Sequence, residues 1–114
     1  MTSATHWIDD ALWSRSLNYD LARAMVGQTL QFFWGDAQGQ THVALLQVEA
    51  CHEGASTASM QQFSLDLSGP AEPLLPQQTY RVRHAEQGDF AVMITPVARQ
   101  ADGFVYQAAF SHAR

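Results

Sequence analysis

Lysine is absent from this sequence, and only 15% of its 114 residues are charged, against about 25% in a typical soluble domain. Six arginines stand against eleven aspartates and glutamates, which gives a formal net charge of −5. An acidic chain does not suit the phosphate backbone, so nucleic acid is not expected as the main partner. The missing lysine has two interpretations: a surface covered in an assembly, since interfaces are depleted in lysine, or a GC-rich genome that favours arginine.

Cysteine occurs once, as Cys51, so no internal disulfide can form and the fold does not depend on an oxidising compartment. The N-terminus, MTSATHWIDDALW, has neither the basic start nor the continuous apolar run of a signal peptide. No stretch approaches the ~18 apolar residues that a membrane span needs. We therefore predict a cytoplasmic protein that has no membrane partner.

Helical spacing is confined to the start of the chain. Residues 5–14 place Trp7, Ile8, Ala11 and Leu12 on one helix face. A second short helix is predicted from the N-cap residue Asn18 to a left-handed stop at Gly27. We expect residues 1–16 to be an N-terminal helical extension and residues 17–114 to be a single β-rich domain.

After Gly27 the period of the apolar residues changes from helical to two, which is typical of strands. The double leucine Leu45-Leu46 breaks the alternation, so we expect a bulge or a doubly buried stretch there, with Ala50 inward and Cys51 outward. The predicted fold is mainly β: a six-stranded antiparallel barrel or sandwich with one or two short N-terminal helices. The six predicted strands are 29–34, 41–51, 61–68, 79–84, 89–97 and 103–111.

Three prolines at three-residue spacing (Pro70, Pro73 and Pro76) separate the third and fourth predicted strands. This spacing matches polyproline II, which is extended and leaves its backbone unpaired. A PxxP ligand for a partner protein is the alternative. Because clean strands flank the segment, we predict that residues 69–77 cross between two parts of the sheet and do not form a tight hairpin.

Several of these segments together resemble one family of small bacterial domains of unknown function. The likeness rests on FSLDLSGP (63–70), LPQQTY (75–80), Gly88, ITPV (94–97) and YQAAF (106–110), and it covers residues 17–110. The resemblance implies the same β-rich fold and brings no catalytic residue or cofactor. It also implies a gene setting beside phage tail-collar-like proteins, and hence a tail-like or surface fibre assembly.

The residues that most resemble a reactive group are Cys51, His52 and Glu53. Adjacent strand residues point to opposite faces, so the thiol and the imidazole should diverge. Five histidines lack the short paired spacing of zinc motifs. We therefore predict no enzyme activity, no metal and no cofactor.

Two sets of residues are candidates for binding. Arg81 and Arg83 share one strand face and could hold a carboxylate or a sugar acid; a solvated sheet surface is the alternative. The apolar N-terminal residues would cover the sheet as a lid or dock on a partner; they are Trp7, Ile8, Leu12 and Trp13. The predicted function is protein binding, with another protein or a second copy as partner, and the alternative is a small-ligand or carbohydrate-binding domain.

Overall fold

The computed structural model describes residues 17–113. The predicted helix over residues 5–14, and with it the proposed N-terminal extension, lies outside the described residues. The second predicted helix is confirmed as α2, Tyr19–Ala24. The Asn18 side chain accepts a hydrogen bond from the Leu21 N–H at 2.8 Å, and Gly27 turns the chain out of the helix with a φ of 87°.

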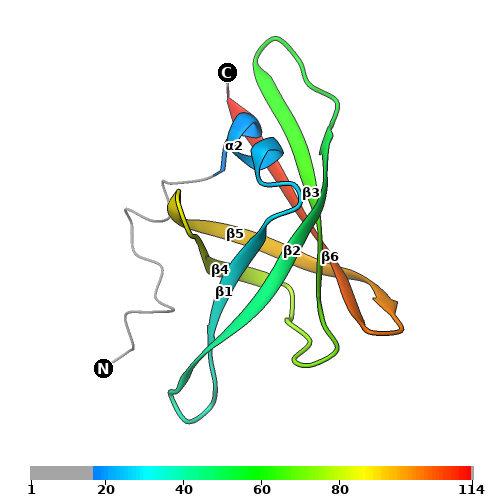
Figure 1. The fold of residues 1–114 in the computed structure, drawn as a ribbon. Coiled ribbons are helices and arrows are strands. Elements are labelled where there is room, and N and C mark those ends of the chain that lie inside the picture. The colour runs from blue at the N-terminus through cyan, green and yellow to red at the C-terminus, as the bar shows by residue number, and fades with distance from the viewer. Residues whose placement is uncertain (1–16, 114) are drawn as a thin grey trace.

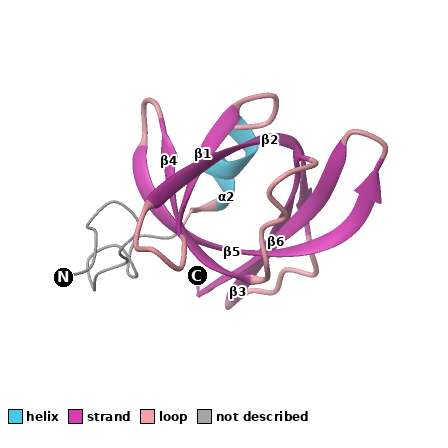
Figure 2. Cartoon of the chain, turned by 90° about the horizontal axis from the view of Figure 1, so that it is seen from below, coloured by secondary structure: helices cyan, strands magenta, loops and turns pink. Residues whose placement is uncertain are grey.

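All six predicted strands are present and pair antiparallel in one sheet. The strand order is β1-β2-β3-β6-β5-β4, and β4 pairs back onto β1, where Phe32 lies opposite Val82. The sheet therefore closes into a ring (Figures 1 and 2). The strands are β1 Thr29–Gly35, β2 Thr41–Glu53, β3 Met60–Pro70, β4 Gln78–His84, β5 Gly88–Gln100 and β6 Gly103–Ala113.

The core fills the inside of this ring because alternate residues of every strand point inward. α2 lies near the C-terminal end of β6 (Figure 1) and adds buried Ala22 to the core. The largest fully buried side chains are Tyr80, Tyr106, Phe32, Phe90, Leu17, Met25, Leu30, Leu46, Leu65, Leu67, Leu75 and Ile94. Among the described residues, no helix is long and apolar enough to cross a membrane.

The irregularity predicted in β2 lies elsewhere than expected. Leu45 is 56% exposed and Leu46 is fully buried, so alternation continues through both leucines. The register to β3 shifts instead between Val48 and Ala50, which leaves Glu49 as the extra residue of a bulge. Because one extra residue reverses the alternation, Cys51 packs against the core, and its predicted outward orientation was wrong.

The proline-rich segment is a crossover, as predicted. β3 pairs with β2 and β6, whereas β4 pairs with β1 and β5, so no hairpin joins β3 to β4. Pro70 is the last residue of β3, opposite Gly103. Two tyrosines of the core bind the crossover that follows. The Leu75 N–H donates to the Tyr106 hydroxyl at 3.0 Å, and the Tyr80 hydroxyl donates to the Pro76 carbonyl at 2.7 Å.

Candidate binding groove

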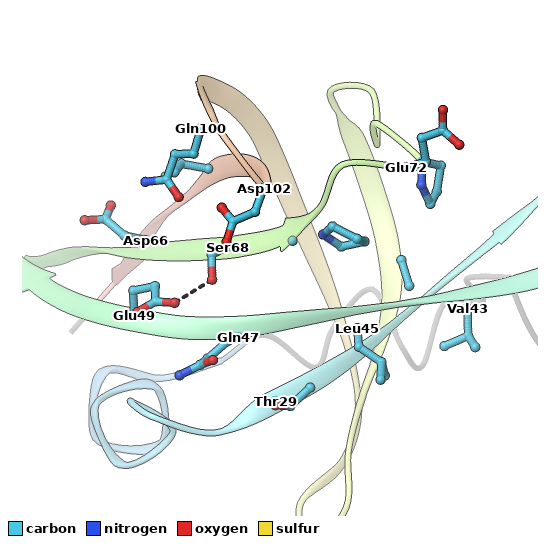
Figure 3. A pocket seen from close by; sticks show the side chains of 15 residues that line it. Thr29, Val43, Leu45, Gln47, Glu49, Asp66, Ser68, Glu72, Gln100 and Asp102 are labelled. Carbon is cyan, nitrogen blue, oxygen red and sulfur yellow. Dashed lines mark hydrogen bonds between the residues drawn. The ribbon is translucent and has the colours of Figure 1, made fainter.

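A groove of about 990 Å³ lies over the outer faces of β2 and β3 (Figure 3). The crossover borders it at Glu72 and Pro73, and the turn between β5 and β6 borders it at Asp102. Its volume is at the upper end of the range for small-molecule pockets, which are about 300–1,000 Å³. The groove is thus built where three stretches of the chain converge on one side of the sheet: β2, the continuous run of β3 and the crossover, and the β5–β6 turn.

One end of the groove is apolar. Val43 and Leu45 lie two residues apart on the outer face of β2 and are 49% and 56% exposed. Phe33 of β1 lies directly opposite Val43 in the sheet, on the same outer face. Two exposed aliphatic side chains in a concave surface are available for apolar contact with a second molecule.

The other end of the groove is polar and acidic. Glu49, Asp66 and Asp102 gather there with Ser68, as Figure 3 shows. The Ser68 hydroxyl donates to Glu49 Oε2. A fourth carboxylate, Glu72 of the crossover, lies apart from these three, on the Val43 side of the view in Figure 3, and the residues that line the groove include no arginine. The groove therefore combines an apolar end with carboxylates that no arginine of its lining neutralises; Asp66 has a histidine beside it, His52.

The bulge at Glu49 decides part of this arrangement. Residues 43, 45, 47 and 49 follow the outer face of β2, and Asp66 and Ser68 follow that of β3. Asp66 Oδ2 lies 2.9 Å from His52 Nε2, because the reversed alternation after the bulge brings His52 to the outer face. The bulge thus places a carboxylate and an imidazole on one outer surface.

A Ser-His-Asp triad needs the imidazole to bridge the hydroxyl and the carboxylate. Here Ser68 is bonded to Glu49, whereas His52 is bonded to Asp66. These four side chains form two separate pairs and no triad.

Cys51 and His52 lie on opposite faces, as predicted, although the bulge exchanged the two faces. Cys51 packs against the core, and burial raises the pKa of its thiol. A raised pKa disfavours the reactive thiolate.

Each of the other described histidines has its own partner, and His6 lies outside the described residues. His42 contacts Asp36 and stacks on Trp34, with ring centroids 4.4 Å apart. Buried His84 contacts Gln28, and His112 donates to the Leu17 carbonyl oxygen at 2.7 Å. In residues 17–113 no three His, Cys, Asp or Glu side chains gather as they would around a metal ion.

Arg81 and Arg83 already hold a carboxylate of this chain. The Nε atoms of both arginines lie 2.7 Å from the oxygens of Asp89 on β5, and Arg83 also lies over the Phe33 ring. These contacts lower the pKa of Asp89, the Arg83 hydrogen bond most of all. Their predicted role toward an outside ligand remains a prediction.

Trp7, Ile8, Leu12 and Trp13 lie outside the described residues. Val43, Leu45, Glu49 and Asp102, in contrast, carry the groove and were not among the predicted site residues. The sequence contained a signal for Leu45. The alternation in THVALLQVEA places this leucine at an outward position of a strand, where an apolar side chain is a candidate for contact with a second molecule. No local sequence pattern predicted that the three segments would converge.

The fold is that of a small, mainly β domain with one short helix. A family model matches residues 17–110, and the chain belongs to this family, a domain of unknown function (DUF6916). The matched residues agree with the range of the resemblance seen in the sequence. Comparisons with curated proteins and with solved structures gave no match.

Proposed function

We propose that this chain is a non-enzymatic, protein-binding β-domain and that the groove over β2 and β3 is its binding surface. The observation that carries the proposal is the pair of exposed aliphatic residues, Val43 and Leu45, in a concave surface that also presents carboxylates and amides. Protein interfaces commonly combine an apolar centre with polar groups at the rim. We also propose that the closed sheet is a barrel, since the pairing of β4 with β1 leaves one continuous ring.

The biological setting that we propose is a phage-tail-like or cell-surface fibre assembly, in which the domain is an adaptor, a chaperone or a minor component. Only the sequence resemblance supports this setting. The acidic groove agrees with a protein partner and disfavours nucleic acid, whose phosphates the carboxylates would repel.

A carbohydrate or other small ligand is the second candidate. The polar end of the groove favours it, because Gln47, Gln100 and Ser68 offer amide and hydroxyl groups for hydrogen bonds. The lining residues include no aromatic ring on which a sugar could stack. For this reason the small ligand takes second place.

The test of the proposal is site-specific cross-linking in the native organism. A photoreactive amino acid at Leu45 should cross-link a partner that mass spectrometry identifies, and the purified partner should bind the wild-type domain and bind Leu45→Ser more weakly. Met93, which is 50% exposed on β5 and does not line the groove, is the matched control position. Equal cross-linking from Leu45 and Met93, or stabilisation by sugars with no protein partner, would overturn the proposal.

A further inference from the structure

The groove has charge of one sign, and this restricts what it can bind. Glu49, Asp66, Glu72 and Asp102 line it, and no arginine does. Since like charges brought together without compensation cost affinity, an acidic segment is a poor occupant. A segment with cationic side chains would instead meet complementary charge on β2, at Glu49, and on β3, at Asp66.

In the part of a second copy that residues 17–113 describe, every arginine already has a contact within its own chain. The sequence has no lysine. Of the four arginines in residues 17–113, Arg81 and Arg83 hold Asp89, Arg23 contacts Asp20, and Arg99 lies over the Phe104 ring. With a formal net charge of −5, two copies also repel each other. The net charge and the contacts of the described arginines therefore favour a different protein over self-association.

The apolar and acidic ends lie in a fixed order along β2. Leu45 and Glu49 are four residues apart, which corresponds to about 13 Å at about 3.3 Å per residue. Figure 3 shows Val43 and Leu45 toward one end and Glu49 and Asp66 toward the other. An occupant must therefore carry apolar side chains at one end and cationic side chains about 13 Å away.

We infer that the groove binds an extended, basic segment of another protein, with aliphatic side chains on Val43 and Leu45 and arginine or lysine side chains against Glu49 and Asp66. This inference rests on the proposed function and specifies the chemistry of the partner. In an extended segment, alternate side chains face the groove, so the required pattern has aliphatic and cationic residues at every second position.

The first experiment uses a fluorescent nonapeptide, Leu-Ser-Leu-Ser-Gln-Ser-Arg-Ser-Arg, and fluorescence polarisation against the full chain. Binding should weaken as salt rises, because ions screen exposed charges. A peptide with glutamate in place of arginine should not bind, and one with serine in place of leucine should bind several-fold more weakly. Equal binding of the glutamate peptide, or no binding of the original peptide at millimolar protein, would overturn the inference.

The second experiment separates the two ends of the groove. Glu49→Gln with Asp66→Asn should weaken peptide binding about two- to ten-fold at low salt and flatten its salt dependence. Leu45→Ser should weaken binding by a similar factor and leave the salt dependence unchanged. Glu86→Gln and Met93→Ser, two exposed positions outside the groove, are the matched controls. An equal loss of peptide affinity in the control variants and the groove variants would contradict the inference that the peptide binds in the groove.

The cross-linking experiment distinguishes this inference from the proposed function. If Leu45 captures a partner whose contact segment has no lysine or arginine, the domain binds protein and the basic-segment inference is wrong. If the captured partner is a second copy of the chain, sedimentation will show a dimer that Leu45→Ser dissociates, and the inference is again wrong. If Leu45 captures nothing beyond the Met93 control, the proposed function itself fails.

Discussion

Asp89 shows how a single carboxylate can satisfy two arginines of a neighbouring strand. Arg83 contacts both of its oxygens, at 2.7 and 3.1 Å, and Arg81 contacts one at 2.7 Å. The side chain of Asp89 is 14% exposed, so the contacts lie partly out of solvent and are worth more than those of a surface ion pair. They join β4 to β5 on the outer face of the sheet.

Replacement of Asp89 by asparagine should lower the free energy of unfolding by about 1–3 kcal/mol at pH 7, because hydrogen bonds to two charged groups are lost. The pKa of Asp89 is lowered in the folded protein, so its stabilising contribution is present above the unfolded value, near 3.8. That contribution is lost as the pH falls through the lower folded value. The wild type should therefore lose more stability than Asp89→Asn on acidification below about pH 5.

Urea unfolding at a series of pH values measures this difference. The matched control is Asp20→Asn, whose carboxylate is 86% exposed and 3.5 Å from Arg23; it should change stability by less than about 1 kcal/mol. Parallel pH profiles for the wild type and Asp89→Asn would contradict the assignment.

At the scale of elements, two tyrosine hydroxyl groups bind the crossover between β3 and β4, one as an acceptor and the other as a donor. Tyr106 accepts from a buried N–H, that of Leu75, whereas Tyr80 donates to the carbonyl of exposed Pro76. Burial raises the pKa of Tyr80 to about 12, so its hydroxyl keeps its proton as a donor at neutral pH. The two contacts fix the crossover to the core at neighbouring residues.

Tyr106→Phe should destabilise the domain by about 1–3 kcal/mol, because the buried Leu75 N–H would be left without a partner. Tyr80→Phe should cost only about 0.5–1.5 kcal/mol, because water can reach the exposed residue whose carbonyl it contacts. Hydrogen exchange of the Leu75 amide should accelerate in Tyr106→Phe and change less in Tyr80→Phe. Equal losses in the free energy of unfolding for the two variants would contradict the larger contribution assigned to the buried Leu75 hydrogen bond.

The pairing of β3 with β6 leaves no room for a side chain at Gly103. A Cβ atom there would overlap the carbonyl oxygen of Gly69, which belongs to the paired backbone and cannot rotate away. Gly103→Ala should therefore destabilise the domain by about 3 kcal/mol, at the upper end for overpacking. Gly39 is the control: its φ is 81° and its surroundings are open, so alanine there should cost about 1–2 kcal/mol. Equal melting temperatures of the two variants would contradict the steric explanation.

At the scale of the whole molecule, the six strands of the described residues form one closed sheet, and each has a neighbour on either side. A strand cannot leave without breaking two ladders, so we expect a single cooperative unfolding transition. Circular dichroism and fluorescence should give the same urea midpoint. Phe32→Ala, at the junction of β1, β2 and β4, should lower both midpoints together and cost about 3–5 kcal/mol. Separate midpoints for the two probes would show that part of the ring unfolds independently.

The strands, the second helix and the crossover could be predicted from the sequence because their signals are local. Asn18 and Gly27 bound α2, and alternation in segments such as FSLDLS identifies the inward residues wherever the strand lies. The prolines between β3 and β4 exclude a tight hairpin for an equally local reason. Coverage of residues 17–110 by the family could likewise be predicted from the order of short motifs.

The sequence by itself determined which residues form strands and, outside the irregular stretches of β2 and β5, which face of each strand is apolar, since a period of two depends only on neighbouring residues. Only the tertiary structure decided which strands pair, that the bulge falls at Glu49, and that Arg81 and Arg83 meet Asp89. It also decided that β2, β3, the crossover and the β5–β6 turn converge on one groove. Those outcomes depend on contacts between residues far apart in the chain, and the ring must close before such residues become neighbours.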